Sequence, residues 1–213
     1  CVSVELHNVF VCPWCHEISC ARRSIFFLSR SSLVMNNPNL CFYTSISDNK
    51  NSSQNLSVIN DITFQNTSIQ FYNISIIFYQ CNFNNTSVDF TAGETRSLFF
   101  VKSSWAGTRK SKAAIQNYRY IQFIHCRFIC TVNYYTPLIV IHYGKHIHFK
   151  SCLFNNIKGI LLKSWSSYNI YINHIVVKNA YIHHYHSKKS PYIFRFYSST
   201  NISIQNSIFA LTD

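Results

Sequence analysis

Acidic residues are scarce in this sequence. Seven Asp and Glu residues stand against 19 Lys and Arg residues, which leaves a formal net charge of +12 at pH 7. Only 12% of the residues are charged, about half the usual share, so long helices laced with surface salt bridges are not expected. The excess of positive charge predicts attraction to an acidic partner.

Glycine and proline are also rare, with four residues of each. No glycine-rich phosphate loop of the Rossmann or P-loop kind can be written anywhere, which excludes those nucleotide-dependent enzymes. No stretch approaches the roughly 18 uninterrupted apolar residues that a membrane-spanning helix needs. The chain opens on Cys1 with no charged leader followed by an apolar segment, which indicates a fragment or a processed chain.

Apolar and aromatic side chains, in contrast, are abundant and recur in a fixed order. Hydrophobic residues make up 47% of the chain, which predicts a folded core. A ten-residue pattern carries apolar residues at its third and eighth positions, as in Ile121-x-Phe123-x-x-Cys126-x-Phe128. Seven copies begin at Val2, Ser57, Ile76, Ile121, Ile147, Ile170 and Ile202.

Each copy predicts two strands joined by a bend. Alternation with period two indicates strands, and the step of three between the third and sixth positions breaks the alternation as a corner would. A second class of strand follows most copies. Its members are residues 24–28, 97–102, 137–142, 160–163 and 191–195.

Two strand types in fixed order predict an all-β fold, a right-handed parallel β-helix of about seven to eight turns, as a single domain over residues 1–213. A β-sandwich is the alternative, but it gives no reason for two strand types to repeat in order. Turns stacked about 4.8 Å apart place like residues on like. Phe78, Phe123, Phe149 and Ile172 are expected in the core, and Asn66, Asn85, Asn156 and Asn179 as an inward amide ladder at a turn. Loop insertions are expected at about residues 12–23, 86–96, 105–117 and 181–190.

The endings Phe83-Asn84-Asn85 and Phe154-Asn155-Asn156, spaced like the copies and preceded by cysteine, resemble a known repeat. They are similar to the repeats of polymorphic-membrane-protein-type β-helix adhesins of chlamydiae and trichomonad protists. The Gly-Gly-Ala-Ile motif of that family is missing. The resemblance implies a surface or adhesive role and carries over no catalytic residue.

Enzymes built on β-helices often attack acidic polysaccharides, which requires paired carboxylates or an acidic ion site. Asp89 and Glu94 are the one candidate pair, and an ordinary solvated loop is strongly favoured over an active site for them. No catalysis and no cofactor are therefore expected. A degenerate polysaccharide-active enzyme remains an alternative.

Seven of the nine cysteines fall into two groups. Cys12-Pro13-Trp14-Cys15-His16, with Cys20 beyond, matches spellings for a disulfide loop, free thiols, zinc or c-type haem, and a loop-pinning disulfide among Cys1, Cys12, Cys15 and Cys20 is favoured. Cys81, Cys126 and Cys152 share one inward position, which predicts a buried stack of reduced thiols.

Seven Asn-x-Ser/Thr sequons favour a secretory history. Asn66 and Asn85 are expected to point inward and to stay unmodified. The remaining candidate glycosylation sites are Asn51, Asn55, Asn73, Asn84 and Asn201.

Alignment of the second strand class places four cationic side chains at one corner of four consecutive turns. They are Lys102, His142, Lys163 and Arg195. Cations stacked about 5 Å apart repel by about 0.8 kcal/mol per pair even in water, so this column predicts an anion-binding edge, with hydrated corners as the alternative.

Two further loops carry clusters of basic residues, and both are expected to be solvated. One could bind a metal through its imidazoles, but no metal site is predicted. The loops comprise His183, His184, His186, Lys188 and Lys189, and Arg109, Lys110 and Lys112.

These observations favour a non-enzymatic structural or adhesive β-helix, secreted or on a cell surface, with a basic edge for an acidic protein surface or an acidic glycan. Neighbouring copies in an assembly are a further expected partner, and no motif predicts specific nucleic-acid binding. The alternative is an intracellular scaffold of the cytoskeletal or ciliary kind, which forms a filament or lies on a microtubule lattice.

Overall fold

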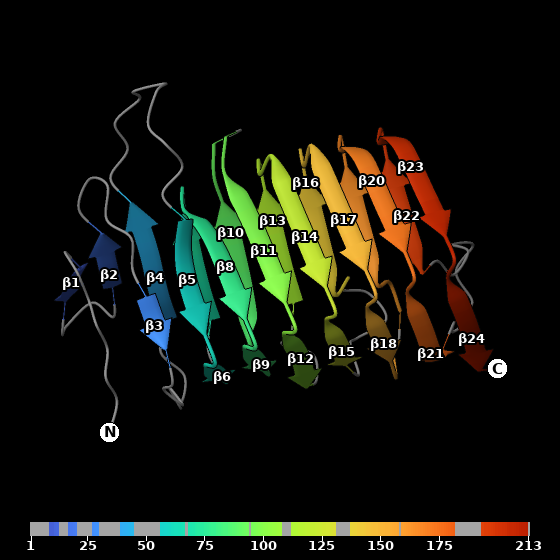
Figure 1. Cartoon of the computed structure of the whole chain (residues 1–213), viewed down its shortest axis with the longest axis horizontal. Helices are drawn as coiled ribbons and strands as arrows, with labels where there is room; N and C mark the ends of the chain where they lie inside the picture. Colours follow the sequence, from blue (N-terminus) through green and yellow to red (C-terminus); the bar gives the residue numbers. More distant parts are fainter. Residues whose placement is uncertain are drawn as a thin grey trace, which may run out of the picture.

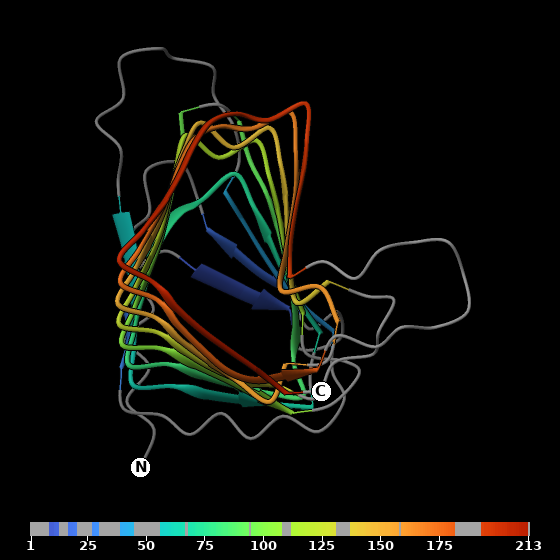
Figure 2. The same ribbon diagram turned by 90° about the vertical axis from the view of Figure 1, so that its right-hand side faces the viewer.

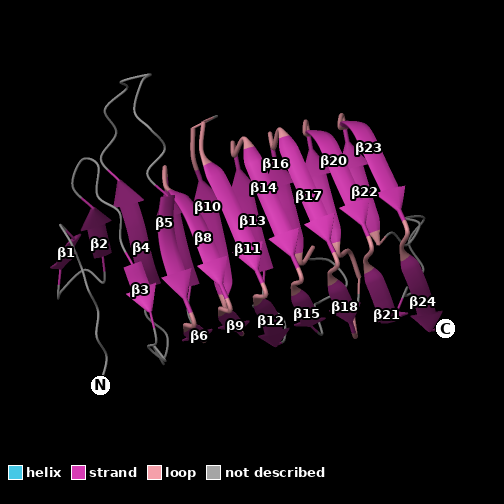
Figure 3. Cartoon of the chain, viewed as in Figure 1, coloured by secondary structure: helices cyan, strands magenta, loops and turns pink. Residues whose placement is uncertain are grey.

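The structure is a computed structural model that describes residues 9–12, 17–20, 27–29, 39–44, 56–66, 68–93, 95–107, 112–130, 137–157, 159–181 and 193–212. All the regular structure in these residues is β-strand, and none is helical. Three long sheets run side by side along the molecule (Figures 1 and 3). Within this part of the chain, no helix has the length and hydropathy to span a bilayer.

The strands follow one another from sheet to sheet in a fixed order. Sheet A has nine strands, β1 (Val9–Cys12), β2 (Glu17–Cys20), β4 (Asn39–Thr44), β7 (Ser68–Tyr72), β10 (Ser87–Thr91), β13 (Lys112–Gln116), β16 (Ile139–His142), β19 (Leu162–Trp165) and β22 (Phe194–Tyr197). Sheet B has eight, β3 (Phe27–Ser29), β5 (Leu56–Asn60), β8 (Ser75–Tyr79), β11 (Ser97–Val101), β14 (Tyr120–Ile124), β17 (His146–Lys150), β20 (Tyr168–Asn173) and β23 (Thr200–Gln205). Sheet C has seven, β6 (Thr63–Gln65), β9 (Asn82–Asn84), β12 (Ser104–Gly107), β15 (Arg127–Cys130), β18 (Leu153–Asn155), β21 (Val176–Tyr181) and β24 (Ile208–Thr212).

This arrangement is a parallel β-solenoid, as the repeat predicted. Each ten-residue copy from Ser57 onward contributes one strand to sheet B and the next to sheet C, and sheet A closes the turn (Figure 2). From β5 to β22 the chain passes through sheets B, C and A six times in this order, slightly fewer than the expected seven to eight turns. From β4 onward, all neighbouring strands within each sheet pair in parallel, as in Phe123 with Phe149.

The corners between sheets are made by residues in the left-handed backbone conformation. Between sheets B and C this residue is Asp61, Gln80, Lys102, His125, Ser151, His174 or Asn206, with φ between 48° and 57°. In Lys102, for example, the amide donates a hydrogen bond to the Ile124 carbonyl of the next turn. This single left-handed residue therefore accounts for the step of three between the third and sixth positions of the sequence pattern.

Three of the asparagines expected to form an inward ladder, Asn66, Asn85 and Asn156, follow strands of sheet C at the corner with sheet A instead, and Asn179 lies at a bulge within β21. Asn66, Asn85, Asn156 and Asn179 all have positive φ, at 51°, 48°, 56° and 50°. Asn66 and Asn179 are exposed and the other two are half-buried, so the inward placement was wrong. Asparagine suits this position because it tolerates the left-handed conformation better than other side chains with a Cβ.

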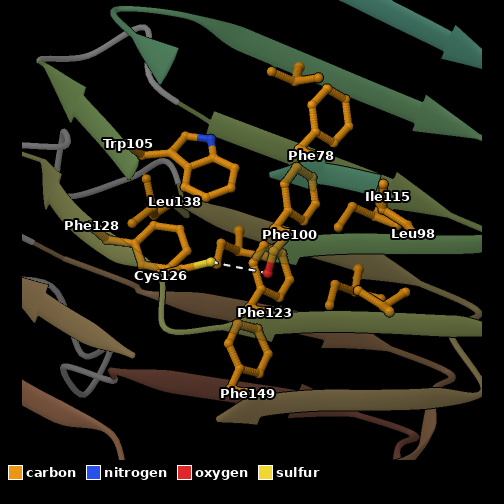
Figure 4. Packing of buried hydrophobic residues seen from close by; sticks show 14 of the residues in the cluster. Phe78, Leu98, Phe100, Trp105, Ile115, Phe123, Cys126, Phe128, Leu138 and Phe149 are labelled. Atoms are coloured by element: carbon orange, nitrogen blue, oxygen red, sulfur yellow. Dashed lines mark hydrogen bonds between the residues drawn. The ribbon is translucent and has the colours of Figure 1, made fainter. Parts of the chain in front are cut away.

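Stacked aromatic rings fill the bore (Figure 4). Phe78, Phe100, Phe123 and Phe149 lie on successive turns with ring centroids 5.0, 4.9 and 4.7 Å apart. These four are at most 2% exposed, as is Ile172 on the following turn. The predicted core residues are thus confirmed.

The long gap between the copies at Ile76 and Ile121 contains a complete turn that the sequence analysis missed. Leu98-x-Phe100-x-x-Ser103-x-Trp105 follows the repeat, and its strands β11 and β12 pair with those before and after. The expected insertions at 86–96 and 105–117 were wrong, because β10 and β13 lie within them in sheet A. Residues 137–142, 160–163 and 191–195 of the second strand class overlap strands of sheet A. Residues 24–28 and 97–102 overlap β3 and β11 of sheet B instead, so these two members were assigned to the wrong class.

The amino-terminal end differs from the rest. Strand β1 pairs antiparallel with β2, with Cys12 opposite Glu17, and β2 then pairs in parallel with β4. The region 12–23, expected to be an insertion, thus contributes a strand to sheet A. Residues 182–190 of the last expected insertion lie outside the described residues.

Candidate anion-binding surfaces

Lys163 and Arg195 are the two members of the predicted cation column that the structure brings side by side. Lys163 in β19 and Arg195 in β22 are register partners in sheet A. Lys163 points outward between the buried Leu162 and Ser164. Arg195 lies between Phe194 and Phe196, which are partly buried against the core. Adjacent strands lie about 4.8 Å apart, so two like charges are held close together here.

His142 lies one outward position further along the strand. It pairs with Trp165, which in turn pairs with Tyr197. The three rings are stacked, with centroids 4.4 Å apart between His142 and Trp165 and 5.3 Å apart between Trp165 and Tyr197. The column therefore splits into two neighbouring files, one aromatic and one cationic.

The aromatic rings hold the cations in place. The Lys163 ammonium lies 3.8 Å from the Trp165 ring centroid and 5.5 Å from that of Tyr197, and the Arg195 guanidinium lies 4.7 Å from the Tyr197 centroid. Such cation–π contacts contribute about 0.5–1 kcal/mol each at exposed sites. We call His142, Lys163, Trp165, Arg195 and Tyr197 the cation–aromatic cluster.

Charge and burial act in the same direction on the pKa values of Lys163 and His142. Partial burial, and then the nearby charge of Arg195, lower the pKa of Lys163. Partial burial, and then the charge of Lys163, lower the pKa of His142. An anion bound here would offset both effects, because it favours the protonated forms.

Lys102 does not belong to this column. It occupies the corner between sheets B and C, where its ammonium donates a hydrogen bond to the Tyr79 hydroxyl at 3.2 Å. The prediction failed because β11 was assigned to the second strand class, whereas it pairs with β8 and β14 in sheet B.

Two other files of cations, which the sequence analysis missed, follow the long edges of sheet B. Three consecutive turns each place one cation at the edge toward sheet A and one near the edge toward sheet C. The first file is Arg96, Arg119 and Lys145, and the second is Lys102, Arg127 and Lys150. Inspection of the residues from the last position of each sheet B strand to three beyond it, and of the residue just before each strand, would have found them.

The thiol stack is buried, as predicted, but it is interrupted. Cys81, Cys126 and Cys152 are free and at most 1% exposed, and Ser103 occupies the turn between Cys81 and Cys126. Each thiol donates to a backbone carbonyl of the preceding turn at 3.3 Å. Burial raises the pKa of Cys81 to about 12 and also raises that of Cys126, so these two thiols stay protonated and unreactive at neutral pH. The hydrogen bond with Cys126 lowers the pKa of Cys152.

Only two of the four cysteines of the expected disulfide loop are among the described residues. Cys12 and Cys20 lie in the hairpin of β1 and β2, opposite Glu17 and Val9. Cys1 and Cys15 lie outside the described residues, so the disulfide loop stays a prediction.

Both basic loops fall largely outside the described residues. These are His183, His184, His186, Lys188 and Lys189 in one loop and Arg109 and Lys110 in the other. Lys112 begins β13, and its ammonium lies 3.9 Å from the Asp89 carboxylate.

Three candidate glycosylation sites are described. Asn201 is exposed, whereas Asn73 and Asn84 are half-buried, and the Asn73 side-chain oxygen accepts a hydrogen bond from Arg96. Asn51 and Asn55 lie outside the described residues.

Carboxylates are not brought together in this part of the chain. Asp89 lies on sheet A beside Lys112, Asp61 lies at a corner between sheets B and C, and Glu94 is outside the described residues. Among the residues described, no group of three or more His, Cys, Asp or Glu could hold a metal ion.

Comparison of the chain with protein-family models, with curated proteins and with solved structures found no match in any of the three. The structure thus shows the parallel β-solenoid that the repeat predicted, and none of the comparisons supports the resemblance to adhesins.

Proposed function

We propose that this β-solenoid is a non-enzymatic structural or adhesive protein that binds an acidic glycan through the cation–aromatic cluster. The observation that carries the proposal is the side-by-side placement of Lys163 and Arg195 against the Tyr197 ring. The two cations repel one another, and a carboxylate or sulfate between them removes that repulsion.

The cluster is suited to anions because its cations are already ordered. Lys163 is held against two rings and Arg195 against one, so binding an anion costs less side-chain entropy than it would for free surface lysines. Arg195 can also bind a carboxylate or sulfate through two parallel hydrogen bonds. His142, in the next file, adds a positive charge when it is protonated.

Binding to immobilised heparin, measured between about 50 and 200 mM salt, tests this proposal. By analogy with nucleic acids, each lost contact reduces the slope of log affinity against log salt by roughly one unit. We expect Lys163→Gln/Arg195→Gln to reduce the slope by about two units. Lys112→Gln/Lys178→Gln removes the same charge from other positions and serves as the control. Equal slopes for the two double variants would refute the cluster as the binding site.

We further propose that the protein is secreted or displayed on a cell surface. The exposed sequon at Asn201 and the sequons at Asn73 and Asn84 support this proposal. Intact-mass measurement of the natural protein before and after glycosidase treatment tests it. Loss of hexose-containing mass is expected, and an unmodified chain would favour the intracellular scaffold.

A further inference from the structure

The outer face of sheet B is apolar where an exposed strand surface is usually polar. Outward positions on its first four long strands carry large apolar side chains, each half-buried. They are Leu56, Val58, Ile77, Tyr79, Phe99, Val101 and Ile124. Further along the same face, Tyr168 and Tyr171 are 38% and 37% exposed.

No described strand of sheet B contains Asp or Glu. The two cation files follow its long edges, one cation near each edge in three consecutive turns, with Arg127 just beyond the edge at the start of β15 in sheet C. Arg119, Lys102, Arg127 and Lys150 are exposed, and Arg96 and Lys145 are half-buried. The outer face of sheet B, whose strands are labelled in Figure 1, thus has an apolar and aromatic centre between two positive margins.

We propose that the outer face of sheet B docks on an anionic lipid surface. The apolar side chains lie at the level of the lipid headgroups, and the two cation files contact the acidic headgroups on either side. A sheet of five-residue strands is about 17 Å wide, and successive turns add about 4.8 Å each, so several headgroups meet the face at once. Amphipathic surfaces with basic margins bind anionic membranes through these same two contributions.

The charge arrangement favours a surface over a single linear polyanion. One extended chain would follow one file and leave the other cations and the apolar centre unused. A planar anionic layer engages both margins and also covers the outward Ile77, Phe99 and Ile124. This site is distinct from the cation–aromatic cluster, which lies on sheet A.

Co-sedimentation with vesicles of phosphatidylcholine alone, or with about 30% phosphatidylserine, tests the proposal. Each Lys or Arg near an anionic membrane strengthens binding by about fivefold. The edge variant Lys102→Gln/Arg119→Gln/Lys145→Gln/Lys150→Gln should therefore bind phosphatidylserine vesicles at least a hundredfold more weakly. The control is Lys112→Gln/Lys163→Gln/Lys178→Gln/Arg195→Gln, which removes the same four charges elsewhere and should lose much less vesicle binding.

A second variant tests the apolar centre without changing charge. Ile77→Thr/Phe99→Thr/Ile124→Thr keeps residues that favour strands, and it should weaken vesicle binding by roughly tenfold while leaving heparin binding unchanged. In Phe99→Trp, the added indole should shift its emission to the blue when phosphatidylserine vesicles are added. The same indole at Gln116→Trp, on sheet A, should not respond.

The outcomes separate this proposal from the glycan proposal. If the edge and control variants lose vesicle binding equally, or if the Phe99→Trp emission does not change on bound vesicles, sheet B is not the docking face. If the threonine variant loses heparin binding as well, the face binds glycans rather than lipid. Failure of the heparin test on Lys163 and Arg195 leaves the vesicle result unaffected, because different residues carry it.

Discussion

Two neighbouring turns carry the same residues and yet differ in burial. Ile170 and Ile172 in β20 are 0% and 1% exposed, whereas their register partners Ile202 and Ile204 in β23 are 38% and 44% exposed. Both pairs point toward the bore. The difference is that β20 lies between β17 and β23, while β23 is the last strand of sheet B.

In this fold the inward side chains of one turn are therefore buried by the two neighbouring turns rather than by their own turn. A single turn is too thin to cover its own inward side chains, which is the general property of solenoids. Stability is then expected to depend on the position of a residue along the axis as much as on its chemistry. The following changes test that expectation, beginning with the largest effect.

Phe123→Ala removes the centre of the ring stack. Phe123 lies between Phe100 and Phe149 and is fully buried, so we expect a loss of about 3–5 kcal/mol in the free energy of unfolding. Phe209→Ala in the last turn, where the ring is 39% exposed, should cost under about 1.5 kcal/mol. Urea denaturation measures both, and similar losses would contradict the comparison.

Ser103→Ala tests the interrupted thiol column. The Ser103 hydroxyl accepts a hydrogen bond from the Cys81 amide and donates to a backbone carbonyl, all in buried surroundings. Leaving the amide unpaired should cost about 1–3 kcal/mol. In the last turn, the Ser207 hydroxyl accepts a hydrogen bond from the Ile175 amide at 3.4 Å near solvent. Ser207→Ala should leave the free energy of unfolding nearly unchanged, because water can accept the hydrogen bond in place of the lost hydroxyl. Chemical denaturation of the two variants distinguishes these cases, and equal losses would mean that axial position is unimportant.

Trp105→Phe separates ring stacking from polar burial. Trp105 stacks between Phe83 and Phe128 with both centroid distances at 4.7 Å, and its buried indole nitrogen makes no hydrogen bond within the described structure. Phenylalanine keeps the stack and removes the unpaired donor, so we expect a change within about 1 kcal/mol of zero. A thermal melt provides the measurement. A loss as large as that of Phe123→Ala would show that ring volume dominates.

Acidification should produce the smallest effect. Partial burial lowers the pKa values of His142 and His148, with contributions from Lys163 and His146 respectively. The unfolded chain then binds protons more readily than the folded one, so this stability is present above about pH 6.5 and is lost as pH falls through the lowered pKa values. Melting temperatures should therefore fall as the pH is lowered below about 6.5. The double variant His142→Gln/His148→Gln should show a smaller fall in melting temperature over the same pH range. An unchanged pH profile in the double variant would assign the decline to other groups.

The inward residues were predictable because their spacing follows from geometry. Alternation along a strand and one left-handed corner residue fix which side chains enter the bore, and Phe78, Phe123 and Phe149 were identified on that basis. The turn through Leu98 and Trp105 was not predicted, because residues 97–102 match the second strand class and residues 105–117 resemble a loop insertion in sequence.

The outward residues were less predictable. Lys163 and Arg195 were placed together correctly, but His142 is shifted by two residues and Lys102 lies at a different corner. Outward side chains pack only on their neighbours across turns, as Trp165 does on His142 and Tyr197, and not against a common core that would impose one residue type on every turn. Which outward groups become neighbours depends on the register of one turn against the next and on the loop lengths between them.

The amino-acid order thus specifies strands, corners and a bore of stacked apolar side chains, because alternation and the corner step are local properties of the backbone. The assignment of each strand to one of three sheets, and the two cation files along sheet B, required the folded chain. Those neighbours are about 20 or more residues apart in sequence, and only the hydrogen-bonded register between turns brings them together.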